Sequence, residues 1–128
     1  MGIDNLREQI LHAARGVCST NSYLNCRLFV QLTSGVSKLE SLPKVSGRPQ
    51  VGDIIQWGSN PARHWSIYLG NGDVLEVPEW GGELGITPIR DVEDEYDRPT
   101  AFRRPEWGAR TAGMVRRLAS RWIKAHAV

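Results

Sequence analysis

Residues 52–77 read GDIIQWGSNPARHWSIYLGNGDVLEV, a segment that predicts three short strands joined by turns. The first strand, residues 53–57, is rich in isoleucine and tryptophan, and the second, residues 64–69, alternates between polar and apolar side chains. Asn71-Gly72 follows, the strongest short signal for a β-hairpin. We therefore expect residues 73–77 to fold back against the second strand.

This hairpin carries two side chains suited to proton transfer. His64 begins the second strand and Glu76 lies near the end of the third. A tight two-residue turn pairs Ile67 with Glu76, so the carboxylate reaches His64 only if the strands twist or the register carries a bulge. A histidine and a carboxylate on neighbouring strands can form a base and the group that orients it, but they lack a nucleophile.

The composition is that of one domain spanning residues 1–128. The chain is 41% hydrophobic and 23% charged, with a formal net charge of +2, which is ordinary for a globular protein. No apolar run approaches the roughly 20 residues that span a bilayer, and the N-terminal segment lacks the apolar region of a secretory signal. The sequence as encoded therefore predicts a cytoplasmic protein, which would need another route to reach a cell wall.

Two N-terminal helices are expected before the strands. Residues 5–17 have one apolar face. A second, short helix is expected to begin after Asn25 as N-cap, with Cys26 in its first turn, and to close at Gly35. The positive end of a helix favours a thiolate at such a position, although an inert buried cysteine fits the same pattern.

The remaining segments complete the expected fold. Residues 36–50 predict a connecting loop, and residues 86–90 and 100–104 a fourth and a fifth strand, with the acidic residues 91–99 as a loop between them. Whether part of this loop, residues 91–97, forms a lid is left open by the sequence. Residues 110–126 predict an amphipathic helix that packs on the domain or makes weak contact with an anionic membrane. The class is α+β, with helices on an antiparallel sheet of about five strands.

The cysteine, histidine and acidic residues argue against metal and nucleic-acid binding and favour a thiol hydrolase. Two cysteines and three scattered histidines do not provide a metal site, so neither a metal nor another cofactor is expected. The acidic residues of the segment 73–97 argue against nucleic-acid binding. A helix-borne cysteine followed by a strand-borne histidine is instead typical of a thiol hydrolase, in which imidazole takes the thiol proton and a third polar group fixes the ring. Cys26, His64 and Glu76 supply these three parts.

Two segments of the sequence resemble a known family. The block VGDIIQWGSNPARHWSIYLGNGDVLEV, residues 51–77, closely resembles the histidine hairpin of the NlpC family of papain-like cysteine peptidases. NCRLFV, residues 25–30, sits where that family has its D-C-S-G nucleophile motif. Both segments also resemble the lecithin:retinol acyltransferase-like branch of the superfamily. That branch is circularly permuted, whereas here the cysteine precedes the histidine, the unpermuted order.

The resemblance implies a papain-like fold and specific roles. Cys26 matches the nucleophile, His64 the general base and Glu76 the third polar position, while TAFRR, residues 100–104, matches the closing strand. This chain departs from the family at Asn25, at Arg27-Leu28 in place of Ser-Gly, and at Glu76, where His, Asn or Gln is commoner.

The expected function follows from these roles. It is a cysteine hydrolase that cleaves an amide bond through a thioester, with a peptidoglycan stem peptide as the implied substrate for an endopeptidase or amidase. The alternatives are a thiol acyltransferase or lipid hydrolase, and a catalytically inactive binding module. The candidate substrate-binding residues are Tyr23, Arg27, Trp65 and Trp80, and Arg27 would narrow the site or select an acidic group.

Overall fold

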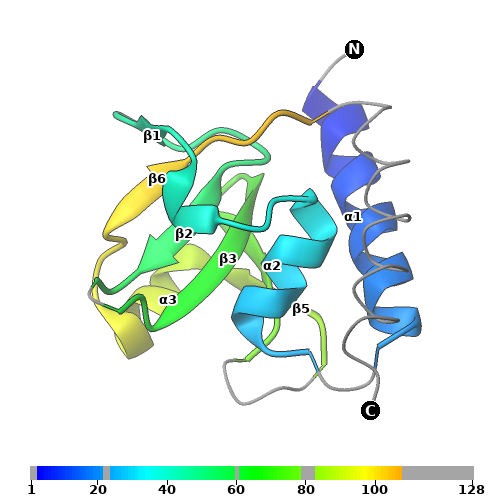
Figure 1. The fold of residues 1–128 in the computed structure, drawn as a ribbon. Coiled ribbons are helices and arrows are strands. Elements are labelled where there is room, and N and C mark those ends of the chain that lie inside the picture. The colour runs from blue at the N-terminus through cyan, green and yellow to red at the C-terminus, as the bar shows by residue number, and fades with distance from the viewer. Residues whose placement is uncertain (1–2, 22–23, 60, 79–82, 108–128) are drawn as a thin grey trace.

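The computed structural model describes residues 3–21, 24–59, 61–78 and 83–107. Within these residues, three helices and six strands form an α+β arrangement in which helices lie on both faces of a sheet (Figure 1). In chain order the elements are α1 (Ile3–Ser19), α2 (Cys26–Ser34), the 3-10 turn η1 (Leu39–Ser41), β1 (Lys44–Val45), β2 (Ile54–Trp57), β3 (His64–Gly70), β4 (Asp73–Glu76), β5 (Gly85–Pro88), α3 (Ile89–Tyr96) and β6 (Ala101–Arg103).

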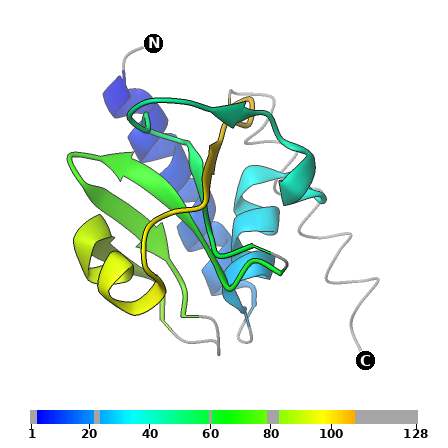
Figure 2. The same ribbon diagram turned by 90° about the vertical axis from the view of Figure 1, so that its left-hand side faces the viewer.

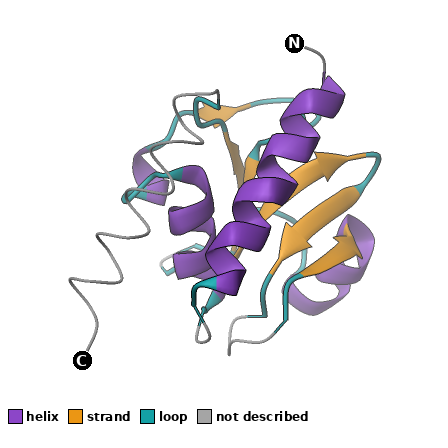
Figure 3. Cartoon of the chain, turned by 90° about the vertical axis from the view of Figure 1, so that its right-hand side faces the viewer, coloured by secondary structure: helices purple, strands orange, loops and turns teal. Residues whose placement is uncertain are grey.

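All six strands belong to one antiparallel sheet with the order β1-β6-β2-β3-β4-β5. Helices α1 and α2 cover one face and α3 covers the other, as the turned views show (Figures 2 and 3). Because both faces are covered, every residue of β2 is buried, which explains why this strand alternates poorly in the sequence. The α+β class and the central antiparallel sheet are confirmed, with six strands where about five were expected.

Helix α2 begins and ends as its sequence predicts. The Asn25 side chain accepts a hydrogen bond of 2.8 Å from the backbone N–H of Leu28, and Gly35 closes the helix at a φ of 74°, in the left-handed region that suits glycine. Six of its nine residues are buried, so the helix is anchored by packing as well as by its caps. These features fix the direction in which its first turn points.

Removing the Asn25 cap should weaken the fold measurably. We expect Asn25→Ala to lower the free energy of unfolding by about 1 kcal/mol, because the Leu28 N–H then lacks its acceptor. Asn25→Asp keeps a capping oxygen and should unfold close to the wild type. Urea unfolding followed by circular dichroism checks both variants. Equal midpoints for alanine and aspartate would show that the cap contributes nothing.

The β3–β4 hairpin forms at the expected turn, but its predicted register is wrong by one residue. Ile67 pairs with Leu75 and not with Glu76, and the register shifts between Tyr68 and Gly70. The extra residue at this bulge moves β4 by one position, so that Leu75 faces the α1–α2 layer. A one-residue shift turns every following side chain to the opposite face of the sheet. Glu76 therefore lies on the same face as His64.

Two segments expected to be loops contain regular structure. Residues 36–50 hold η1 and β1, because the buried Leu39 packs into the core and Lys44–Val45 pairs with β6. Most of the acidic stretch belongs to helix α3, which extends from Ile89 to Tyr96. Its apolar residues Val92 and Tyr96 are four positions apart, and both are buried against the sheet. Residues 91–96 are therefore helical, and the expectation of a loop there is wrong.

The other expected elements differ in length or lie outside the described residues. The helix predicted over residues 5–17 extends to Ser19, where the hydroxyls of Ser19 and Thr20 donate to the carbonyl of Gly16. The predicted helix over residues 110–126 falls outside the described residues. Among the helices that the structure describes, none is long and apolar enough to cross a membrane.

Candidate active site

The first turn of α2 presents Cys26 at the sheet. The thiol residue is 6% exposed and follows directly on the Asn25 cap. Backbone N–H groups at a helix start are only partly satisfied, and with the helix dipole they favour negative charge nearby. The start of α2 thus places the Cys26 side chain beside partly satisfied backbone N–H donors.

His64 is the first residue of β3. It is 1% exposed, and its Nε2 atom lies 3.3 Å from Oε2 of Glu76 on the neighbouring strand. Its other ring nitrogen, Nδ1, is buried and has no hydrogen-bond partner among the described residues. One ring nitrogen is therefore held by a carboxylate, which leaves Nδ1 as the nitrogen that can exchange a proton with a neighbouring group.

The electrostatic surroundings favour the imidazolium form of His64. Burial lowers the pKa of this side chain and is the largest single influence, but interactions with Cys26 and Glu76 together outweigh it and raise the pKa from 6.5 to about 9. The Cys26 thiol is thus close enough to affect the ring, although Nδ1 lacks a hydrogen-bond partner among the described residues. The structure brings Cys26, His64 and Glu76 together from α2, β3 and β4.

A fourth residue at this position was missed by sequence reasoning. Tyr96, the last residue of α3, stacks on the His64 ring with 4.6 Å between ring centroids and 4° between ring planes. It also packs on Trp57 at 6.5 Å. The i, i+4 spacing of Val92 and Tyr96 in the acidic stretch was the signal that this segment buries an apolar face, but nothing local indicates that the face meets a histidine.

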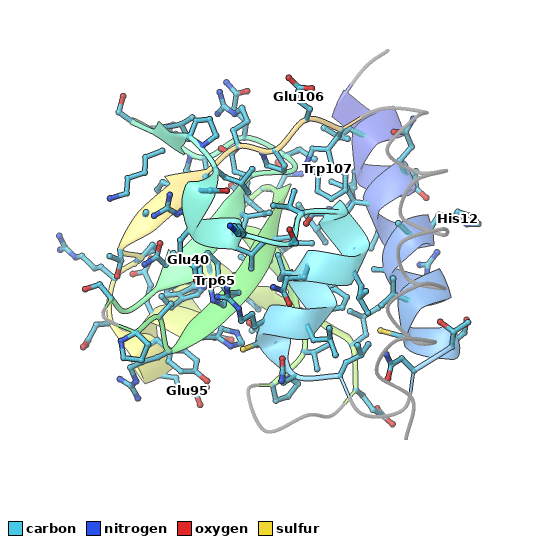
Figure 4. The ribbon with its side chains drawn as sticks, in the orientation of Figure 1. His12, Glu40, Trp65, Glu95, Glu106 and Trp107 are labelled. Atoms are coloured by element: carbon cyan, nitrogen blue, oxygen red, sulfur yellow. The ribbon has the colours of Figure 1, made fainter. Side chains whose placement is uncertain are left out.

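Arg27 is positioned beside the cysteine by two partners. Its guanidinium forms a two-pronged ion pair with Glu40 of η1 and lies 5.7 Å from the centre of the Trp65 ring. Figure 4 labels Glu40 and Trp65 in front of the sheet. The charge on the Glu40 carboxylate interacts with the arginine expected to meet the substrate, and sequence reasoning did not identify this glutamate. Trp65 itself is only 2% exposed, so its buried ring forms the surface on which the Arg27 guanidinium packs.

Two of the candidate substrate-binding residues, Tyr23 and Trp80, lie outside the described residues. Among the residues that the structure describes, no group of three or more histidine, cysteine, aspartate or glutamate side chains is arranged to hold a metal ion.

The arrangement defines an α+β protein with a buried cysteine beside a histidine–carboxylate pair. No family model matches the chain. It is 42% identical over 45 residues to the peptidoglycan endopeptidase RipA of Mycobacterium tuberculosis, and 40% identical over 45 residues to RipA of Mycolicibacterium smegmatis. Each match covers 35% of this chain and about a tenth of the relative, 10% and 9%. Over this short region the chain is similar to peptidoglycan endopeptidases.

Proposed function

We propose that this protein is a cysteine hydrolase that cleaves an amide bond through a thioester on Cys26. The observation that carries the proposal is the orientation of His64, whose Nε2 faces Glu76 while its buried Nδ1 lacks a partner among the described residues. Because Nε2 is occupied by Glu76, the ring can exchange a proton with a thiol only through Nδ1. The positive end of α2 adds the donors that acyl transfer needs.

The proposed reaction has two halves. Nδ1 of His64 takes the proton of the Cys26 thiol, and the thiolate attacks the carbonyl carbon of the substrate. The C–N bond breaks, the leaving amine receives the proton from Nδ1, and a thioester remains. His64 then removes a proton from water, which attacks the thioester and releases the acid and the thiol. Glu76 accepts the Nε2–H bond throughout and stabilises the cation, while N–H groups at the start of α2 stabilise each oxyanion.

The substrate class that we propose is the peptidoglycan stem peptide, for an endopeptidase or amidase activity. It is supported by the family resemblance of the histidine hairpin and by the short matches to RipA. Arg27, which packs on the buried Trp65 ring, is the proposed substrate contact among the described residues, and Tyr23 and Trp80 are further ones. An exposed ion pair such as Arg27–Glu40 is weak enough to be exchanged for a substrate carboxylate.

The pH dependence of alkylation at Cys26 tests the proposed thiol–imidazole pair. We expect iodoacetamide to modify Cys26 well below pH 7 in the wild type and to do so about tenfold more slowly in His64→Ala, because the paired thiolate is then lost. Cys18 is an internal control, since burial raises the pKa of its thiol. Mass spectrometry of the modified peptides reports both sites in one sample. If Cys26 reacts no faster than Cys18 at pH 6, the protein is an inactive binding module on this fold.

A further inference from the structure

The imidazole of His64 is contacted on its flat face as well as at its nitrogens. The ring of Tyr96 lies parallel to it, with a centroid separation of 4.6 Å and an interplanar angle of 4°. Tyr96 is 6% exposed and His64 1% exposed, so solvent does not separate the two rings. We call this contact the His64–Tyr96 stack.

Helix α3 holds the tyrosine firmly in this position. Val92, one turn earlier, is 2% exposed, and Ile89 packs against the same apolar cluster. The helix ends at Tyr96, because Asp97 adopts a φ of 66° and its backbone N–H bonds to the Glu93 carbonyl. The helix thus carries the tyrosine ring to the face of the sheet opposite α2.

A parallel aromatic neighbour has two physical effects on an imidazole. It limits rotation of the ring about its Cβ–Cγ bond, because a turned ring would collide with the tyrosine. The negative face of an aromatic ring also attracts a cation, so the stack favours the imidazolium form. Ionisable or charged groups near these rings include Cys26 from α2 and Glu76 from β4, and the guanidinium of Arg63 lies 5.4 Å from the centre of the Tyr96 ring.

We propose that Tyr96 is a positioning residue that holds the His64 ring in the plane in which Nε2 meets Glu76 and Nδ1 faces the thiol. The proposal deepens the proposed function, since ring orientation matters for hydrolysis only if His64 acts as the base. It also assigns a role to α3, whose acidic outer face gave no indication of one in the sequence. Tyr96 acts through His64 and need not touch the substrate.

The test compares variants that keep or remove the aromatic ring. Tyr96→Phe keeps the stack and removes the hydroxyl, whereas Tyr96→Leu and Tyr96→Met keep an apolar side chain without a ring. Val92→Ala is the matched control, because it loosens the packing of α3 and leaves both aromatic rings of the stack in place. Melting temperature verifies that each variant is folded, and having both Leu and Met variants guards against the failure of one to fold.

Two readouts separate positioning from stability. The first is the titration of His64 followed by NMR on protein with labelled histidines, with His64→Gln identifying the resonance. We expect its midpoint to fall by about half a pH unit in Tyr96→Leu and Tyr96→Met, and to stay unchanged in Tyr96→Phe and Val92→Ala. The second is hydrolysis of peptidoglycan fragments, where we expect kcat to fall about tenfold or more without the ring and KM to change less than twofold.

Specific results would overturn the proposal. A folded Tyr96→Leu variant with the wild-type His64 titration and kcat would show that the ring does not position the imidazole. A Phe variant as impaired as Leu would assign the effect to the hydroxyl, and an equal effect of Val92→Ala would assign it to helix packing. If no fragment is hydrolysed by the wild type but the His64 titration shifts as expected, the positioning role of Tyr96 is supported and the proposed peptidoglycan substrate is wrong.

Discussion

Cys26→Ala should abolish hydrolysis of peptidoglycan fragments, with a loss of about 10⁴-fold or more in kcat. The sulfur of Cys26 is the protein atom that bonds to the substrate carbonyl carbon in the proposed reaction, and the alanine methyl cannot replace it. Cys26 is 6% exposed in the first turn of a short, capped helix, so losing one sulfur atom leaves the surrounding packing nearly intact. The variant should therefore be folded and inactive.

Release of stem-peptide fragments from purified cell walls, analysed by liquid chromatography and mass spectrometry, measures this effect. Cys18→Ala is the matched control: Cys18 is half-buried near the end of α1 and has no role in the proposed reaction, so its loss should leave kcat unchanged. If Cys26→Ala retains more than about a hundredth of the wild-type rate, no thioester at this residue can be obligatory. If wild type and variant are equally inactive, the substrate proposal fails, and the alkylation experiment still tests the thiol–imidazole pair.

Replacement of Glu76 should give the second large effect, with a dependence on pH. Glu76→Ala removes the partner of Nε2 and one of the influences that raise the pKa of His64 to about 9. We expect kcat to fall by about 10²-fold to 10⁴-fold, because the ring loses its orienting group. The pH at which activity declines on the alkaline side should also move down, since the imidazolium is then lost at a lower pH.

A second substitution of Glu76, to glutamine, links the site to stability. A group whose pKa is raised on folding binds its proton more tightly in the native state, so it adds stability that is complete below its unfolded pKa, about 6.5, and is lost as the pH rises through about 9. The wild type should therefore exceed Glu76→Gln in free energy of unfolding at pH 6 by on the order of 1 kcal/mol, and the difference should shrink by pH 10. Urea unfolding at the two pH values measures it. A difference that grows with pH would contradict the assigned direction of the His64 shift.

The ion pair between Arg27 and Glu40 should contribute less to stability than the His64–Glu76 pair. The hydrogen bonds with Arg27 lower the pKa of the Glu40 carboxyl, but both side chains are substantially exposed, 40% and 50%. Exposed pairs contribute little to stability. The pair therefore fixes the place of the guanidinium beside Cys26 more than it holds the fold together.

The sequence by itself determined the elements whose signals are local. The apolar spacing of α1, the Asn25 cap and Gly35 end of α2, and the Asn71-Gly72 turn depend on neighbours within a few residues, so all were predictable. The chemical types at Cys26, His64 and Glu76 were equally visible, and so was the order in which they occur along the chain.

Only the tertiary structure decided how these parts meet. The bulge between Tyr68 and Gly70 sets which face of the sheet Glu76 occupies, and a single extra residue in a strand leaves no clear mark in the alternation of side chains. Helix α3 was not predicted because its segment is rich in acidic residues. Its apolar residues Val92 and Tyr96 are buried only because the sheet packs against them. The His64–Tyr96 stack joins residues 32 positions apart in the chain (96 − 64), and such long-range contacts are fixed by packing and not by local preference.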